Sequence, residues 1–249
     1  MVIKYGGNAM TDDATRQRAA AALYDATLGG EPPVVVHGGG PFIKAALDAA
    51  GLEHRFERGL RVTTPESLEV IESVLTLLGK KLAQEIGPAV GLTGRDAALL
   101  HAAQRPELGR VGRMTRVEPR ILGALRAAGL VPVVACLALG EDGGLLNVNA
   151  DEVAGAVAGA LGEGVVFLTN VPGVLDDPAD PGSLLAELTR SAALDRMADG
   201  RIAGGMIPKV EAALAALDQG APFAVVADGR DAAGVNAALA GGGTRVTAG

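Results

Sequence analysis

The chain has 249 residues, of which 49% are hydrophobic and 20% are charged, and its formal net charge is −7. This composition is ordinary for a soluble globular protein and excludes a disordered chain. The negative charge argues against nucleic acid or an anionic membrane as the main partner, because neither would be attracted over long range. An anionic ligand must therefore meet positive charge that is placed locally.

Short β-rich runs alternate with longer helical runs along nearly the whole sequence. Strands are expected at residues 2–5, 33–37, 90–92, 131–137, 165–169, 223–227 and 244–247. Helices are expected near residues 13–28, 41–50, 65–86, 118–128, 150–161, 205–219 and 231–240. Short apolar strands that are each followed by a helix predict an α/β fold with a largely parallel sheet covered on both faces.

Two polar, arginine-containing segments, 53–62 and 98–117, interrupt this alternation. We expect both to form hairpin-like excursions from the edge of the sheet. Between them, Thr64 followed by Pro65 predicts a helix start, because a hydroxyl suits the N-cap and proline suits the first helical position. No run of proline, serine or charge marks a linker. The sequence is therefore predicted to form one domain with two functional halves, about 1–150 and about 151–249.

The only cysteine, Cys136, excludes an intramolecular disulfide and a metal cluster built on cysteines. It lies in the apolar run VPVVACLAL, so we expect a small buried side chain rather than a nucleophile. No basic segment followed by an apolar one opens the sequence, and no apolar run is long enough to cross a bilayer. These features predict a cytoplasmic protein without a secretory signal.

Several expected strands end in glycine or a small polar residue, at the edge of the sheet where ligands of α/β proteins gather. These strand ends are Gly6-Gly7-Asn8, Gly38-Gly39-Gly40, Thr93-Gly94, and Thr169-Asn170 leading to Gly173. A glycine turn that opens a helix presents free backbone N–H groups and suits phosphate or carboxylate. A single such glycine more often serves only backbone geometry or close packing. Four such strand ends on one rim favour a ligand site.

The common nucleotide-binding motifs are absent from the sequence. No G-x-x-x-x-G-K-[ST] is present, which excludes a Walker-type NTPase. No G-x-G-x-x-G follows the first strand, which weakens a dinucleotide-dependent oxidoreductase, and the protein-kinase motifs are missing.

Three charged residues stand out by their position. Lys4 lies inside the first strand; it is either an edge-strand lysine whose stem reaches solvent or a cation beside the following glycine loop. Lys209 opens a helix after Gly-Gly and a proline, where an isolated lysine is usually solvated. Asp151 ends the alternating series Asn147, Asn149 and Asp151; a helix N-cap explains one of these residues but not all three.

The segments IKYGGNAM, VVVHGGGP, RGLRVT, LLNVNADEVA, LTNVPGVL and GGMIPKV have the order and approximate spacing seen in N-acetylglutamate kinases, which belong to the amino acid kinase family. The sequence resembles that family from residue 2 to about residue 247. RGLRVT and NVNAD favour these enzymes over carbamate, aspartate or uridylate kinases. The resemblance implies a three-layer α/β/α sandwich with a mostly parallel central sheet. It also implies that the N-terminal half holds the acyl amino acid and the C-terminal half holds ATP.

The resemblance assigns roles to individual residues. Lys4 and Lys209 would stabilise the transition state, and Asp151 would lie between them, ion-paired to both. The expected substrate-binding residues are Gly39, Gly40, Arg61, Asn147 and Asn149. The expected nucleotide-binding residues are Gly6, Gly7, Thr169, Asn170, Val171, Gly173, Leu175, Arg201, Ile202 and Ala203. Some relatives carry Asp at the position of Asn170.

The implied reaction is phosphoryl transfer from ATP to the side-chain carboxylate of N-acetyl-L-glutamate, a step of arginine biosynthesis. This carboxylate, with a reference pKa of about 4.3, is already ionised at neutral pH and needs no general base. His37, His54 and His101 therefore need no catalytic role. Mg²⁺ is expected on the ATP phosphates, held by them and by water, with no protein metal site.

The implied reaction gives a physical reason for the residue type at three positions, two glycines and one arginine. Gly39 and Gly40 would let backbone N–H groups touch both reactants, because a Cβ there would hold them apart. Arg61 would bind the α-carboxylate of the substrate through its planar fork, which lysine could not reproduce. The ordinary alternative for Arg61 is a surface arginine on a hairpin.

Two alternatives remain besides an acetylglutamate kinase: a related kinase that acts on carrier-linked aminoadipate, and a non-catalytic amino acid sensor with the same fold. Retention of both lysines and Asp151 argues against the sensor. Relatives inhibited by arginine have an N-terminal helix that links dimers into a ring. The sequence begins three residues before Lys4, so we expect a homodimer with little arginine feedback.

Overall fold

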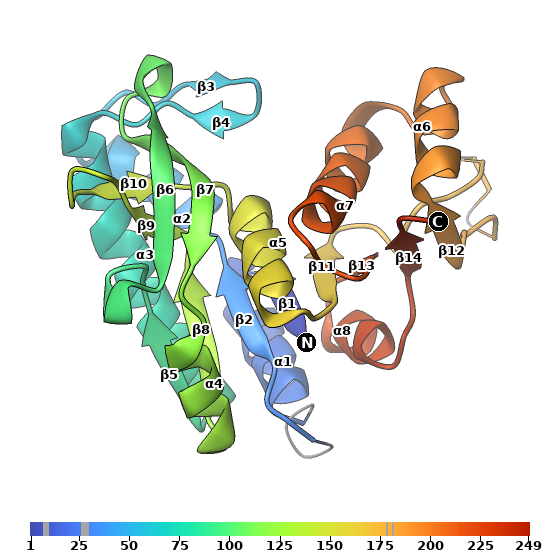
Figure 1. The fold of residues 1–249 in the computed structure, drawn as a ribbon, viewed down its shortest axis with the longest axis horizontal. Helices are drawn as coiled ribbons and strands as arrows, with labels where there is room; N and C mark the ends of the chain where they lie inside the picture. The colour runs from blue at the N-terminus through green and yellow to red at the C-terminus, as the bar shows by residue number, and fades with distance from the viewer. Residues whose placement is uncertain (7–9, 26–29, 178, 181) are drawn as a thin grey trace.

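The computed structural model describes residues 1–249 except 7–9, 26–29, 178 and 181 (Figure 1). Its main sheet has eight strands in the order β12-β14-β13-β11-β1-β2-β8-β5. These strands are β1 (Val2–Tyr5), β2 (Val34–His37), β5 (Ala89–Leu92), β8 (Val131–Ala135), β11 (Val165–Thr169), β12 (Glu187–Thr189), β13 (Ala224–Asp228) and β14 (Thr244–Thr247). Neighbouring strands pair in parallel except β13 with β14.

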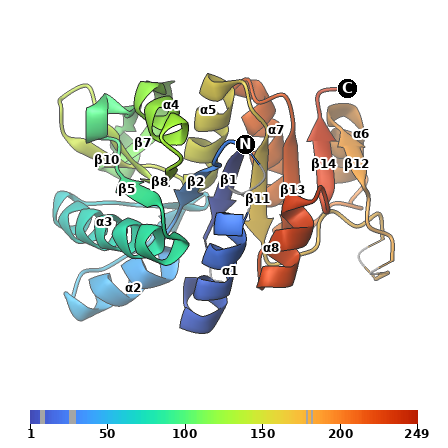
Figure 2. The ribbon, with the colours of Figure 1, turned by 90° about the horizontal axis from the view of Figure 1, so that it is seen from below.

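Helices cover both faces of this sheet. They are α1 (Asp13–Asp25), α2 (Gly40–Ala49), α3 (Pro65–Ile86), α4 (Arg120–Ala127), α5 (Ala150–Leu161), α6 (Arg190–Ala198), α7 (Ile207–Asp218) and α8 (Ala232–Leu239). Viewed from below, α4, α5 and α7 lie over one face, and α1, α3 and α8 lie over the other (Figure 2). The expected three-layer α/β sandwich with a mostly parallel sheet is confirmed.

Side-chain alternation along the strands divides the core into two layers. Ile3 and Tyr5 of β1 pack with Val35 in the cluster that contains residues of α1 and α8. Val2 packs on the opposite face, in the cluster that contains residues of α5 and α7. Lys4 has the same parity as Val2, so its side chain points to the α5 side of the sheet.

A smaller β-structure is joined to one side of the main sheet. Strands β6 (Leu100–Arg105), β7 (Val111–Val117), β9 (Leu137–Leu139) and β10 (Leu145–Asn147) close into a four-stranded barrel, and β3 (Phe56–Glu57) pairs with β4 (Leu60–Arg61). Short 3-10 helices occur at η2 (Asp96–Ala98), η3 (Pro106–Leu108) and η4 (Gly204–Met206). The excursions predicted for 53–62 and 98–117 therefore both contain hairpins.

The elements differ from the expectations in two places. The strand expected at 131–137 is two strands, since β8 ends at Ala135 and β9 starts at Leu137; the chain leaves the main sheet for the barrel at Cys136. Strand β12 and helix α6 were not predicted. Helix α1 ends at Asp25, and residues 26–28 of the helix expected near 13–28 lie outside the described residues.

Within the described ranges, no helix has the length and apolar character that a membrane span requires.

Candidate active site

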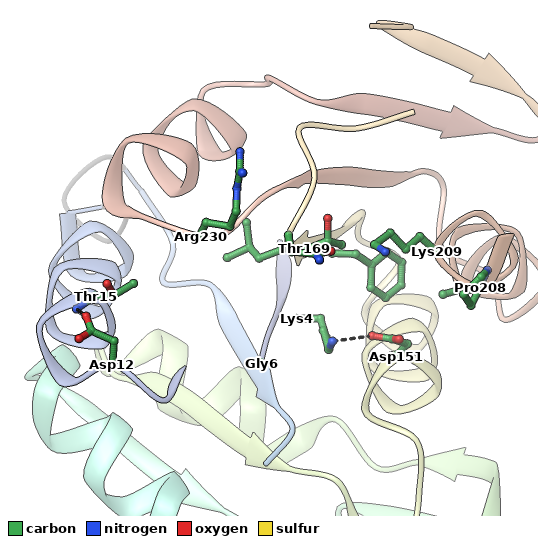
Figure 3. A pocket seen from close by; sticks show the side chains of 13 residues that line it. Lys4, Gly6, Asp12, Thr15, Asp151, Thr169, Pro208, Lys209 and Arg230 are labelled. Atoms are coloured by element: carbon green, nitrogen blue, oxygen red, sulfur yellow. Dashed lines mark hydrogen bonds and ion pairs between the residues drawn. The ribbon is translucent and has the colours of Figure 1, made fainter. Parts of the chain in front are cut away.

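A cavity of about 620 Å³ lies at the carboxyl ends of β1 and β11, beside the first turns of α5 and α7 (Figure 3). Such a position is where open α/β sheets bind ligands. Of the residues predicted for the site, Lys4, Gly6, Asp151, Thr169, Asn170 and Lys209 line this cavity. Residues far apart in the sequence are therefore gathered around one space.

Lys4 and Asp151 form an ion pair in this cavity. The Lys4 Nζ lies 3.0 Å from the Asp151 Oδ1, with side chains that are 18% and 34% exposed. Because both groups are partly shielded from water, their attraction is screened less than that of a surface pair. The second interpretation of Lys4, a cation beside the glycine loop, is the one that the structure supports.

The first turn of α5 fixes the position of Asp151. Asn149 is the N-cap of this helix, and its Oδ1 accepts a hydrogen bond from the Asp151 N–H at 2.7 Å. A carboxylate in the first turn is also favoured by the positive end of the helix dipole. Asn149 therefore orients the turn that carries Asp151, in addition to lining the neighbouring cavity.

Lys209 lies on the other side of the cavity, in the first turn of α7 (Figure 3). Its Nζ donates a hydrogen bond to the Gly205 carbonyl at 2.9 Å, one turn earlier in the chain. In this structure Asp151 pairs with Lys4 and not with Lys209, and the expectation that Asp151 pairs with both lysines stays a prediction. A local carbonyl holds the Lys209 ammonium instead, while Lys209 still lines the same cavity as Lys4.

Close packing of α5 against α7 sets the separation of these charges. A Cβ on Gly159 would lie 1.9 Å from the Gln219 carbonyl oxygen, and a Cβ on Gly155 would lie 3.0 Å from the Ala216 Cα. Glycines four residues apart on α5 thus face successive parts of α7 and its C-terminus, which means that the two helices run parallel. Their N-termini, with Asp151 and Lys209, therefore lie at the same end of the pair.

A second cavity, of about 260 Å³, adjoins the first, and Lys4 and Asp151 line both. All five residues predicted to bind the substrate line this second cavity: Gly39, Gly40, Arg61, Asn147 and Asn149. The two ion-paired side chains therefore lie where the two cavities meet.

Arg61 is the buried cation of the second cavity. Arg61 is only 9% exposed. Burial lowers the pKa of its guanidinium, but an arginine stays protonated at neutral pH. One nitrogen, Nη2, lies 3.4 Å from the Gly40 carbonyl, and Nη1 has no hydrogen-bond partner among the described residues. A desolvated guanidinium with an unused N–H group is a strong site for a carboxylate.

In the loop after β2, Gly39 makes a packing contact with α3 that the sequence did not predict. A Cβ on Gly39 would lie 2.8 Å from the Leu75 Cδ2 and 3.2 Å from the Leu78 Cδ2 of α3, so a side chain here would require these two leucine side chains to shift. A Cβ on Gly40 would meet no atom of the described residues within 4 Å. The close approach of reactants stays a prediction for both glycines, and Gly39 has a packing contact with α3 in addition.

Two potentially reactive side chains near the site are held in a neutral form. His37 is fully buried, burial lowers its pKa to about 4, and its Nδ1 lies 3.1 Å from the Gly38 carbonyl. A neutral imidazole with its proton on Nδ1 donates to that carbonyl and shapes the loop. Burial also raises the pKa of the Cys136 thiol to about 12, so this thiol is not a nucleophile at neutral pH.

Only some of the predicted nucleotide-binding residues line the large cavity. Thr169 and Asn170 do, and the Thr169 Oγ1 also accepts a hydrogen bond from the Val171 N–H at 3.2 Å. Gly7 lies outside the described residues. The predicted residues that do not line this cavity are Val171, Gly173, Leu175, Arg201, Ile202 and Ala203.

These outlying residues have other contacts. A Cβ on Gly173 would lie 2.6 Å from the Thr244 Oγ1, so Gly173 packs against β14. Ile202 is buried in the core, and Arg201 pairs with Asp199 at 2.6 Å. Thr93-Gly94 does not line the cavities either: a Cβ on Gly94 would lie 2.2 Å from the Leu137 carbonyl oxygen, which indicates a packing role.

Sequence reasoning missed a cation and two polar residues at the far end of the large cavity: Arg230, Asp12 and Thr15. Arg230 follows β13, and its Nη2 pairs with Asp228 at 2.6 Å, which lowers the pKa of that carboxyl group. Asp12 accepts a hydrogen bond from the Thr15 N–H at 2.6 Å at the start of α1. The sequence Asp-Gly-Arg at the end of β13 could have indicated Arg230, because ligands of α/β proteins bind at the carboxyl ends of the strands.

Among the residues that the structure describes, no group of three or more histidine, cysteine, aspartate or glutamate side chains could hold a metal ion.

Comparison with known proteins matches residues 1–228 to the model of the amino acid kinase family. The chain is 57% identical over 249 residues to the acetylglutamate kinase of Deinococcus radiodurans, covering 99% of each protein. It is 48% identical over 233 residues to the acetylglutamate kinase of Thermus thermophilus, covering 92% of this chain and 90% of the relative.

Solved structures share the fold at lower identity. An N-acetylglutamate synthase from Neisseria gonorrhoeae superposes with a TM-score of 0.82 at 21% identity, over 99% of this chain and 58% of that one. Carbamate kinase from Giardia lamblia superposes with a TM-score of 0.72 at 19% identity, over 99% of this chain and 97% of that one. Fold, family model and full-length relatives agree, and the chain belongs to the amino acid kinase family.

Proposed function

We propose that the protein transfers the γ-phosphoryl group of ATP to the side-chain carboxylate of N-acetyl-L-glutamate, giving N-acetyl-L-glutamyl 5-phosphate for arginine biosynthesis. One observation carries this proposal: Lys4 and Asp151 lie at the junction of two cavities, with Lys209 on the larger one and Arg61 on the smaller one. The relatives named acetylglutamate kinase, which match over nearly the whole chain, support the choice of substrate.

The larger cavity is suited to the triphosphate of ATP. Three cationic side chains, Lys4, Lys209 and Arg230, line it, and its volume of about 620 Å³ is in the range of small-molecule sites. Thr169 and Asn170 contribute polar groups. When bound, Mg²⁺ would neutralise charge on the phosphates, and it would be held mainly by those phosphates and by water.

The smaller cavity is suited to the acyl amino acid. Arg61 would bind its α-carboxylate, and Asn147 would be oriented by the hydrogen bond from its Nδ2 to the Thr63 Oγ1 at 3.2 Å. The side-chain carboxylate would then point to Lys4. We propose on this basis that about 1–150 binds the acyl amino acid and about 151–249 binds ATP.

The obstacle to this reaction is electrostatic, because an anion must approach a polyanion. Catalysis by positioning and charge neutralisation is sufficient for phosphoryl transfer to an ionised carboxylate. Lys4 and Lys209, from opposite walls of the cavity, would neutralise charge on the transferring group, and Asp151 would hold Lys4 in place. Within this proposal, the family resemblance supports ATP contacts at the remaining predicted nucleotide-binding positions and a homodimeric state.

The decisive experiment traps the acyl phosphate with hydroxylamine while ADP release is followed. N-acetyl-L-glutamate is compared with glutamate, aspartate and N-acetylaminoadipate. We expect acyl hydroxamate chiefly with N-acetyl-L-glutamate. Hydroxamate with N-acetylaminoadipate alone would assign the chain to the aminoadipate kinases, and no hydroxamate with any substrate would refute the kinase.

The roles of the two lysines are tested by Lys4→Ala and Lys209→Ala. Each should lower kcat by about 10²–10³-fold and change KM much less, because removal of one preorganised transition-state donor has this effect. Lys44→Ala is the matched control, since Lys44 lies on the exposed face of α2 in a surface pair with Asp48. Near-normal turnover in either site variant would remove that lysine from the mechanism.

A further inference from the structure

We propose that Phe56 is a positioning residue for the substrate carboxylate, acting through Arg61: its ring supports the guanidinium and fixes the plane in which the fork meets a carboxylate. The inference rests on the proposed function and deepens it, because it explains how the pocket selects a free α-carboxylate on an acylated amino acid. The argument depends on the turn, the ring contact, and the unused hydrogen-bonding capacity of Arg61.

A tight turn fixes which residue faces Arg61. Strands β3 and β4 are joined by Arg58 and Gly59, whose φ angles are +48° and +78°. Two central residues with positive φ form the two-residue turn that suits the twist of a hairpin. The register then pairs Glu57 with Leu60 and Phe56 with Arg61. Directly paired residues lie on the same face of a hairpin, so the ring and the guanidinium are neighbours by construction.

The ring contact has the geometry of a cation–π interaction. The Arg61 Cζ lies 4.6 Å from the centroid of the Phe56 ring, within the usual limit of about 6 Å. Phe56 is 56% exposed. Aromatic residues make up only 2% of the chain, so an exposed phenylalanine is unusual in this protein. The ring adds little to the apolar core, and neither of the two core clusters includes it. Its position therefore favours a role at the mouth of the cavity.

The contact with the ring leaves Arg61 able to bind a carboxylate. A phenyl ring offers no oxygen or nitrogen acceptor, so it does not replace a carboxylate as the partner of the guanidinium N–H groups. Nη2 is directed to the Gly40 carbonyl, and Nη1 has no hydrogen-bond partner in the part of the chain that the structure describes. Both Phe56 and Arg61 line the smaller cavity. A carboxylate that enters therefore meets a fork whose orientation is already set, and less rotamer freedom is lost on binding.

The test compares Phe56→Leu with Phe56→Tyr. Phe56→Leu keeps an apolar side chain but removes the π face; we expect KM for N-acetyl-L-glutamate to rise about 2–30-fold, since cation–π contacts are worth roughly 0.5–2 kcal/mol and 1.4 kcal/mol is tenfold. The KM for ATP and kcat should change less than twofold. Phe56→Tyr should restore the KM because its ring is retained. The matched control, Tyr24→Leu, removes another exposed aromatic ring that lines neither cavity.

A double-mutant cycle shows whether Phe56 acts through Arg61. In an Arg61→Gln background, Phe56→Leu should have almost no further effect on KM, because the partner of the ring is gone. An unchanged KM in Phe56→Leu, an equal rise in Phe56→Tyr, or full additivity with Arg61→Gln would overturn the inference.

Calorimetric titration with N-acetyl-L-glutamate separates this inference from the proposed function. If wild-type protein binds N-acetyl-L-glutamate without turning it over, the proposed function fails, and the affinities of the variants still decide the role of Phe56. Wild-type protein that shows no binding would overturn both.

Discussion

Lys4 lies in a central strand whose neighbouring core positions are apolar, and its charge is balanced by one partner, Asp151. The alternation of β1 directs it to the α5 side, where the N-cap of α5 presents Asp151 at 3.0 Å. If Asp151 were removed, a partly buried ammonium would remain without its counter-charge, which is costly in free energy. A loss of activity in Asp151 variants therefore has to be separated from a loss of folding.

His37 makes protein stability depend on pH. Burial lowers its pKa from 6.5 to about 4, so between these pH values the unfolded chain binds a proton that the native protein does not. The free energy of unfolding should therefore fall by about 3 kcal/mol from this residue as pH drops from 6.5 to 4.

Urea unfolding at pH 7, 6 and 5 measures this dependence. The slope with pH should be shallower in His37→Asn, whatever the stability of that variant at pH 7, because Asn does not titrate. His101→Asn, which removes an imidazole from β6 beside Arg116, is the control. Equal slopes in wild type and His37→Asn would contradict the assignment.

At the scale of residues, the sequence predicted that Lys4 and Asp151 lie close together, but it did not predict the side-chain conformation of Lys209. Parity along β1 and the start of α5 are enough to bring Lys4 and Asp151 to one edge of the sheet. The bond from Lys209 to the Gly205 carbonyl depends on the rotamer of a flexible side chain and on a turn of irregular backbone. Neither is encoded in a periodic pattern, so the sequence did not predict the contact that Lys209 makes with Gly205.

At the scale of elements, the contact of α5 with α7 works as a spacer for the active-site charges. Gly159→Ala would place a Cβ 1.9 Å from the Gln219 carbonyl oxygen, so the helices must move apart. Overpacking of this kind costs about 1–3 kcal/mol. Because α7 carries Lys209 and α5 carries Asp151, we also expect kcat to fall more than KM rises.

Gly123→Ala is the matched control for this prediction. Gly123 lies in α4, and a Cβ there would meet no atom of any described residue within 4 Å. Alanine is favoured over glycine inside a helix by roughly 0.5–1 kcal/mol, so this control should be neutral or slightly stabilising. Thermal unfolding and steady-state kinetics of both variants are the measurements. A Gly159→Ala protein with wild-type kcat and stability would refute the spacer role.

Elements with a strong local signal were predicted well, and those fixed by distant contacts were not. Thr64 caps α3 by accepting a hydrogen bond from the Ser67 N–H at 3.2 Å, as the Thr-Pro start predicts. In contrast, β12 is three residues long and exists through its pairing with β14. Helix α6 follows it with a polar composition. Neither segment has the apolar period on which prediction relies.

At the scale of the molecule, the halves proposed to hold the two substrates share one core. The main sheet runs through both, and a single cluster of buried side chains includes Leu68 and Val134 of one half with Val210 and Val246 of the other. The halves should therefore unfold together, although chains of this length often show intermediates.

Differential scanning calorimetry tests this cooperativity. We expect one transition whose calorimetric enthalpy equals its van't Hoff enthalpy, with and without the ATP analogue AMP-PNP. Two resolved transitions, or an analogue that shifts only part of the heat uptake, would show that the halves are separate folding units.

The position of Phe56 also gives the protein a place for an optical reporter. The chain contains no tryptophan, so an indole introduced there by Phe56→Trp would be its only long-wavelength emitter. Indole is the aromatic system that binds cations best, so the support for Arg61 would be kept. Arrival of a carboxylate beneath that ring could then be followed in real time by fluorescence, without an attached dye.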